Sequence, residues 1–207
     1  ECNDSFREKE ALIFIGDSQL NTLSVDILQN YKNLNCYYNV SFITNPKGRC
    51  LLSKQNDTGE LHVCTDEFFE KFILDLNNQK ANVVVIGRFN TWLDPKKGGM
   101  EVQCDDCDFN QILKKRFSAI ASNSKKLILI EPIPTYQENI VESYLYKRVS
   151  WGESITIEYK DWKEDMEQTT LFINSLNSNA IQRIDTSALF CNIFEIGKCN
   201  ASTIKEL

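Results

Sequence analysis

The sequence is poor in several residues whose abundance would mark a particular class of protein. It has 4 prolines and 8 glycines in 207 residues, which excludes collagen-like and low-complexity chains. Basic residues are outnumbered as well, because 23 Lys and Arg stand against 29 Asp and Glu and no basic run exceeds three residues. Such a charge distribution offers little attraction for phosphate backbones, so we expect no nucleic-acid partner.

Long hydrophobic runs are also missing. The longest, residues 81–87 and 127–130, have the length of strands, whereas a helix needs about 20 apolar residues to cross a bilayer. We therefore expect no membrane insertion by these residues. A hydrophobic content of 42% is enough for a buried core, and we expect one domain over residues 1–207. The chain begins at Glu1 without Met or an apolar leader, so we expect it to be a fragment of a longer chain.

Cysteine, by contrast, is abundant, with 8 residues. Metal binding and disulfides are the two interpretations. A zinc site would need scattered ligands, because Cys104 and Cys107 form the only CxxC motif and His62 is the only histidine. Four N-x-S/T sequons favour disulfides, since both features belong to an oxidising, glycosylating compartment. We therefore expect a glycoprotein that is secreted, extracellular or in the lumen of the secretory pathway. The sequon asparagines are Asn3, Asn39, Asn56 and Asn200.

The hydrophobic pattern alternates between strand-like and helix-like stretches. Short apolar runs predict five strands, at residues 11–16, 37–44, 82–87, 126–131 and 180–185. Helical spacing predicts helices at residues 19–31, 65–78, 109–121, 138–148 and 159–176, with Thr65 as an N-cap. Residues 45–64 and 89–108 are interpreted as loops. The alternation predicts an α/β fold, a three-layer sandwich around a five-stranded, mainly parallel sheet.

The tripeptide Gly16-Asp17-Ser18 stands directly after the first predicted strand. Ligands gather where the carboxyl ends of parallel strands meet the following loops. A serine on a turn at a helix N-terminus also lies where free N–H groups stabilise an oxyanion. The same tripeptide is equally an ordinary helix cap, because Asp and Ser are common N-cap residues.

The order of the motifs resembles the SGNH hydrolase superfamily, and within it the SGNH domains fused to acyltransferase-3-type membrane O-acyltransferases. The segments that carry the resemblance are residues 13–18, 50–64, 83–89 and 126–134, and the cysteine pair after Ile184-Asp185. The resemblance implies a flavodoxin-like fold and no cofactor or metal. It also implies an acyl ester and a carbohydrate acceptor as substrates, and a membrane acyltransferase domain in the same chain as partner.

The resemblance also implies roles for individual residues. Ser18 is the expected nucleophile, with its own N–H in the oxyanion hole. Gly48 is the candidate for the glycine of the second family block, and Gly87 with Asn90 for the third block. Asn90 is equally interpreted as a loop asparagine that caps a turn. Gln19 departs from the histidine that commonly follows the serine in this subfamily.

The general base is the largest departure from the family pattern. A serine hydroxyl is a poor nucleophile without a base, and the family's Asp-x-x-His motif is absent from residues 1–207. His62 either meets Ser18 or is an ordinary surface histidine. We expect the motif beyond Leu207. With that base, the resemblance implies an O-acyltransferase or O-acetylesterase. The alternatives are a catalytically inactive SGNH-fold binding ectodomain and a structural, disulfide-stabilised ectodomain.

Four disulfides follow as hypotheses. Pairing of Cys50 with Cys64 would tie down the long loop, and pairing of Cys191 with Cys199 would close a small C-terminal loop. Each would restrict the unfolded chain by roughly 3 kcal/mol in the loop-entropy model. The two remaining hypothetical pairs are Cys104 with Cys107 and Cys2 with Cys36.

Overall fold

The computed structural model describes residues 9–30, 34–44, 47–53, 65–94, 107–132, 154–176, 179–187, 191–192 and 198–203. The chain divides into two compact units. The sheet unit comprises Glu1–Ile130 and Gln168–Ile184, and the small unit comprises Glu131–Glu167 and Asp185–Leu207. No helix within the described ranges is long and apolar enough to cross a membrane.

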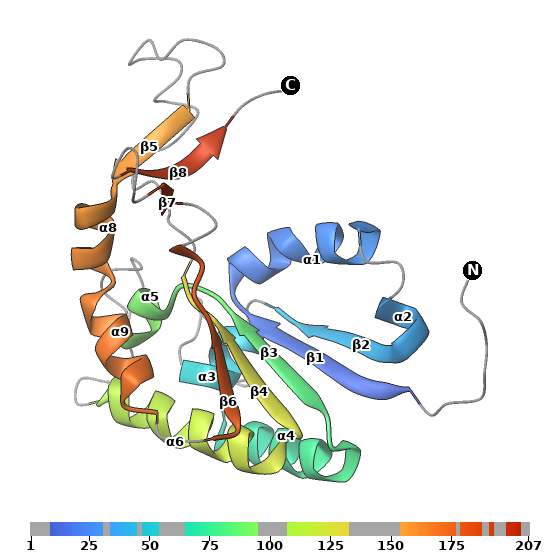
Figure 1. The fold of residues 1–207 in the computed structure, drawn as a ribbon. Coiled ribbons are helices and arrows are strands. Elements are labelled where there is room, and N and C mark those ends of the chain that lie inside the picture. Colours follow the sequence, from blue (N-terminus) through green and yellow to red (C-terminus); the bar gives the residue numbers. More distant parts are fainter. Residues whose placement is uncertain are drawn as a thin grey trace. The chain divides into compact units, whose positions relative to one another are not determined.

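The sheet unit is built on five parallel strands in the order β2-β1-β3-β4-β6 (Figure 1). The central strands are short, continuous runs of Val, Ile and Leu, as expected for a parallel sheet that is covered on both faces. The predicted α/β fold with a five-stranded parallel sheet is therefore confirmed. The strands are β1 Glu10–Gly16, β2 Tyr38–Ile43, β3 Asn82–Ile86, β4 Lys126–Ile130 and β6 Ile181–Ile184.

Helices pack on both faces of this sheet. The helices of the sheet unit are α1 Ser18–Asn30, α2 Leu34–Tyr37, α3 Lys47–Ser53, α4 Asp66–Gln79, α5 Phe89–Leu93, α6 Phe109–Asn123 and α9 Glu167–Asn174. Side chains that alternate along each strand point to opposite faces. Ile13 and Val85 therefore join the larger core cluster, whereas Phe14 and Val84 pack on the other face with Leu20 of α1.

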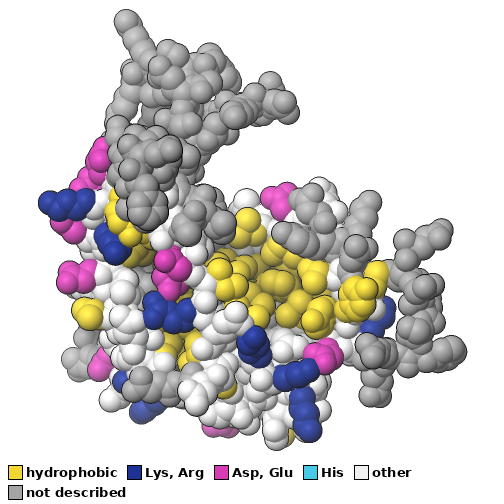
Figure 2. Space-filling model, viewed as in Figure 1, with side chains coloured by type: hydrophobic (Ala, Val, Ile, Leu, Met, Phe, Trp, Pro, Cys, Tyr) yellow, Lys and Arg dark blue, Asp and Glu magenta, His cyan; other side chains and the backbone are white. Residues whose placement is uncertain are grey.

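The two faces differ in how fully they are covered. The larger cluster draws buried residues from α3, α4, α5, α6 and α9. The smaller one has five buried residues and many half-buried ones, among them Phe42, Ile128 and Ile130. Figure 2 shows hydrophobic side chains gathered over β1, β2 and β3 on the face turned toward the viewer.

Helix α4 agrees most closely with its sequence pattern. The Thr65 side chain accepts a hydrogen bond from Phe68 N at 3.3 Å, which confirms the predicted N-cap. Asp66 and Glu67 occupy the first turn, where the helix dipole favours acidic residues. The buried face of α4 carries Phe72 and Leu76.

Three predictions about the segments between the strands were wrong or incomplete. The predicted loop at residues 45–64 contains helix α3, whose Leu51 and Leu52 are fully buried. The predicted loop at residues 89–108 begins with the short helix α5. The predicted helix at residues 159–176 is two helices, α8 (Tyr159–Asp165) and α9, and the boundary between the two units falls at the start of α9. The predicted helix at residues 138–148 lies outside the described residues.

The small unit contains a three-stranded antiparallel sheet that the sequence analysis did not predict. Its strands, in the order β5-β8-β7, are β5 Ser154–Glu158, β8 Lys198–Thr203 and β7 Cys191–Asn192. Helix α8 follows β5 directly, and its Trp162 forms a small apolar cluster with Cys191.

Cysteines are placed in both units. Those at four described positions are disulfide-bonded, namely Cys36, Cys50, Cys107 and Cys191. Cys191 stands opposite Cys199 in the register of β7 and β8. The hypothetical partners of the other three, Cys2, Cys64 and Cys104, lie outside the described residues, so the four pairings stay predictions.

Candidate active site

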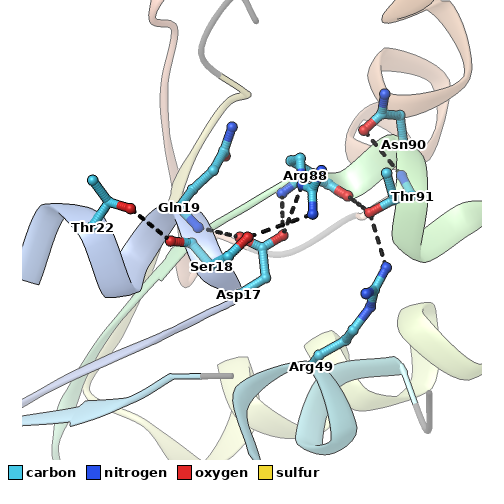
Figure 3. Close-up of polar contacts among 8 residues, drawn as sticks. All are labelled: Asp17, Ser18, Gln19, Thr22, Arg49, Arg88, Asn90 and Thr91. Carbon is cyan, nitrogen blue, oxygen red and sulfur yellow. Dashed lines mark hydrogen bonds and ion pairs between the residues drawn. The ribbon is translucent and has the colours of Figure 1, made fainter. Parts of the chain in front are cut away.

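The carboxyl edge of the sheet brings together two segments that are 70 residues apart in sequence. The first runs from the end of β1 into α1, and the second from the end of β3 into α5 (Figure 3). Parallel neighbours such as β1 and β3 end at the same edge. Asp17 and Ser18 therefore face Arg88 across the gap between adjacent strands.

The Asp17 carboxylate is the centre of this arrangement and is 1% exposed. Its Oδ1 accepts a hydrogen bond from Gln19 N, and its Oδ2 accepts one from Arg88 N, both at 2.9 Å. Arg88 Nε lies 3.8 Å from the same Oδ2. Asp17 therefore caps α1 and also ties the start of α1 to the end of β3. The helix-cap interpretation of the tripeptide is confirmed for Asp17.

Capping by Asp17 leaves the Ser18 side chain for another role. Ser18 is exposed and is the first residue of α1. Its hydroxyl Oγ lies 3.5 Å from Nη2 of Arg88, whose side chain is 40% exposed. Figure 3 shows the guanidinium reaching toward both Asp17 and Ser18. The site thus joins an exposed hydroxyl to a cation that a buried carboxylate holds in place.

Two glycines allow the surrounding segments to approach the tripeptide. A Cβ on Gly48 of α3 would overlap the carbonyl oxygens of Gly16 and Ile43. A Cβ on Gly87 would overlap the ring of Trp92 and lie 3.1 Å from Asp17 Cγ. Both candidate glycines therefore lie close to the candidate nucleophile. Gly48 N, however, donates to Thr44 O at 2.8 Å, so this N–H is already used within the start of α3.

Asn90 is held differently from the role that the family resemblance implies. It lies in the first turn of α5, and its Oδ1 accepts a hydrogen bond from Thr91 N at 3.0 Å. In Figure 3 its amide lies beyond Arg88 as seen from Ser18 and points away from the serine. This geometry agrees with the alternative interpretation, an asparagine that caps a turn.

A second arginine supports the segment after β3. Arg49 of α3 is 3% exposed, and its Nη2 donates to Thr91 Oγ1 at 3.3 Å. Thr91 Oγ1 in turn donates to Arg88 O at 2.8 Å. Helix α3 is therefore connected to the backbone of Arg88 through Thr91, and the position of Arg88 depends on both neighbouring helices.

Sequence reasoning missed Arg88, Arg49 and Thr91. Arg88 could have been recognised as a candidate, because it is a cation directly after a buried strand, at the edge where ligands gather. No sequence pattern pointed to Arg49 or Thr91, since their contact joins two short helices that the sequence analysis had interpreted as loops.

The other predicted site residues lie away from this cluster or outside the described ranges. Asn39 is an exposed residue of β2, with its Nδ2 3.5 Å from Lys9 O. Asn200 lies on β8 of the small unit. His62, Asn3 and Asn56 lie outside the described residues. Within the described part of the chain, no three His, Cys, Asp or Glu residues are grouped to hold a metal ion.

Comparisons with known proteins agree with this architecture. The model of a family described as "SGNH domain (fused to AT3 domains)" matches residues 2–204. Among solved structures, the periplasmic domain of a lipopolysaccharide acetyltransferase from Salmonella ser. Paratyphi A superposes with a TM-score of 0.59. It is 18% identical, and the match covers 93% of this chain and 71% of that one. No protein with a curated description matches.

Proposed function

This chain belongs to the family of SGNH domains fused to AT3 domains, and we propose that it transfers or hydrolyses O-acyl esters of carbohydrates through an acyl-Ser18 intermediate. The observation that carries the proposal is the position of Ser18. Its exposed hydroxyl lies at the carboxyl edge of the sheet, 3.5 Å from the Arg88 guanidinium, while Asp17 performs the capping of α1. The hydroxyl is therefore available to react.

The proposed reaction proceeds in two halves. Ser18 Oγ attacks the ester carbonyl carbon, the carbonyl π electrons move onto oxygen, and the hydroxyl proton passes to a general base. Collapse of this intermediate breaks the bond to the leaving alcohol, which takes the proton back. In the second half, a carbohydrate hydroxyl or water attacks acyl-Ser18 in the same way and releases the enzyme.

The base is proposed to be a histidine, as in the superfamily that the chain resembles. His62 is the only histidine in these 207 residues, and the family's Asp-x-x-His motif is expected after Leu207. The two sources are separable by experiment. Substitution His62→Ala abolishes activity if His62 is the base and leaves it unchanged if the histidine comes from another segment.

We propose an extracytoplasmic location, with a membrane acyltransferase domain in the same chain supplying the acyl group. The family description supports the partner, because its members are SGNH domains fused to AT3 domains. The similar solved structure is itself a periplasmic domain. Disulfide-bonded cysteines at four described positions agree with an oxidising compartment. We also propose that the four sequons are glycosylated and that residues 1–207 form one domain.

The test is release of acetate from a generic acetyl ester by the protein in its natural full length, expressed through a secretory pathway. Ser18→Ala is expected to abolish activity. Ser24→Ala is the matched control, because it removes a hydroxyl from the same helix that bonds only locally, to Asn21 O at 2.8 Å. Full activity in Ser18→Ala would contradict the proposal.

One observation favours a second candidate function, a catalytically inactive binding domain. The Asp-x-x-His motif is absent from residues 1–207, and a serine without a base hydrolyses esters poorly. A folded full-length protein that neither releases acetate nor reacts with a serine-directed fluorophosphonate would support this candidate.

A further inference from the structure

We infer that the Arg88 guanidinium binds the oxyanion that forms on the substrate carbonyl when Ser18 attacks. This inference rests on the proposed function, which assigns Ser18 as the nucleophile. It gives the charge-stabilising role to an arginine that sequence reasoning had not singled out, in place of the amide of Asn90.

The position of Arg88 is suited to this role. Nη2 lies 3.5 Å from Ser18 Oγ, at the outer limit of a hydrogen bond, and such contacts shorten when a substrate binds. A guanidinium carries five N–H donors in a fixed plane. Nε faces Asp17, so Nη donors on the side of Ser18 are available to an incoming oxygen. The 40% exposure of the side chain leaves this side open to substrate.

Arg88 is also fixed before any substrate arrives. Its backbone N donates to Asp17 Oδ2 at 2.9 Å, and its carbonyl accepts from Thr91 Oγ1 at 2.8 Å and Thr91 N at 2.9 Å. The Asp17 carboxylate also lies 3.8 Å from Arg88 Nε, within the range of an ion pair and beyond that of a hydrogen bond. A donor that is already oriented stabilises developing charge most, because no reorganisation is needed during the reaction.

Two of the donors implied by the family resemblance, Gly48 N and the Asn90 amide, are placed unfavourably for this role. Gly48 N donates to Thr44 O, within the start of α3. The Asn90 amide is held against Thr91 N and points away from Ser18 (Figure 3). Among the described side chains, Arg88 is the one whose donor has a contact with Ser18 Oγ.

Arg88 takes part in the proposed step only as a hydrogen-bond donor. The bond from Ser18 Oγ to the carbonyl carbon forms, and the π pair becomes the oxyanion. The hydroxyl proton goes to the histidine-type base of the proposed mechanism. Arg88 donates hydrogen bonds to the oxyanion and keeps all its protons. When the intermediate collapses, the carbonyl re-forms and the protonated base gives its proton to the leaving alcohol.

The experiment compares Arg88 variants of the natural full-length protein in two assays, acetyl ester turnover and the rate of Ser18 modification by a fluorophosphonate. Arg88→Met is expected to lower kcat and the modification rate by about 10²–10³-fold, with KM nearly unchanged. Arg88→Lys is expected to restore part of the loss. Added guanidinium is expected to rescue Arg88→Ala, which a purely structural role would not allow. Arg183→Met is the control, since Arg183 is exposed on β6 and bonds Asn174.

The outcomes separate this inference from the proposed function. If Ser18→Ala abolishes both assays while Arg88→Met keeps kcat within about twofold, the proposed function stands and the role of Arg88 is overturned. If the wild-type protein shows neither turnover nor modification, both are overturned. If Arg88→Met does not fold, the Arg88→Lys variant and the guanidinium rescue decide the question.

Discussion

Two arginine–carboxylate pairs join distant segments of the sheet unit, and they differ in which partner is buried. At the candidate active site, the side chain of Asp17 is 1% exposed and that of Arg88 is 40% exposed. Beneath the sheet, the Arg116 side chain is 6% exposed and that of Asp66 is 64% exposed. The first pair therefore hides its carboxylate, and the second hides its guanidinium.

The buried partner indicates what each pair does. Arg116 Nη1 donates to the carbonyl oxygens of Cys50 and Leu51 at 2.9 and 2.5 Å, and the guanidinium lies 4.6 Å from the centre of the Phe69 ring. Burial lowers the pKa of Arg116, while Asp66 opposes this effect. Its donors bond carbonyls in the second half of α3, so Arg116 connects α6 to α3. We call this arrangement the Arg116 clasp. Arg88, held by a buried carboxylate, keeps donors for a ligand.

The largest expected effect on stability comes from Arg116→Met. The substitution removes the two buried hydrogen bonds that Arg116 donates to α3 carbonyls, and each such loss costs about 1–3 kcal/mol. We expect the free energy of unfolding to fall by about 3 kcal/mol in urea titrations. Arg88→Met should change it by less than 1 kcal/mol while removing activity. Equal stability losses in the two variants would contradict the contrast between the pairs.

The fold was largely predictable because its signals are local. The strands β1, β3 and β4 are continuous apolar runs, and α4 has a capping threonine and a regular apolar face. The misses are short elements. Helix α3 spans only two turns, too few to show a helical period, and it is defined by burial of Leu51 and Leu52 and by the Arg116 clasp.

The candidate site was predictable only in part, for a related reason. Ser18 could be found because its tripeptide is contiguous and follows a strand. Arg88 could be placed at the same edge. Its contact with Ser18, however, depends on the register of β1 and β3 and on the close packing of Gly87 against Trp92 and Asp17. The preference for Arg88 over Asn90 depends on which way each side chain turns, and sequence spacing does not determine that.

Asp17→Asn is expected to lower stability less than Arg116→Met does. It is also expected to lower activity. The amide oxygen can replace only one of the two acceptors, so either Gln19 N or Arg88 N loses its partner. The negative charge facing Arg88 Nε also disappears. We expect unfolding to become about 2 kcal/mol easier and kcat to fall at least tenfold, because Arg88 is no longer held. Unchanged kcat at the same loss of stability would show that Asp17 is only a helix cap.

The smallest effect is expected from the matching substitution in the other pair, Asp66→Asn. Asp66 is mostly exposed, and its Oδ1 lies 3.1 Å from Arg116 Nη2. Exposed ion pairs contribute about 0–1 kcal/mol, and an acidic residue in a first helical turn adds a similar amount. We therefore expect a loss of about 0.5 kcal/mol, reduced further in 1 M salt, with kcat unchanged. A loss as large as that of Asp17→Asn would mean that the exposed carboxylate is essential to the clasp, and the burial of a partner would then not distinguish the two arginines.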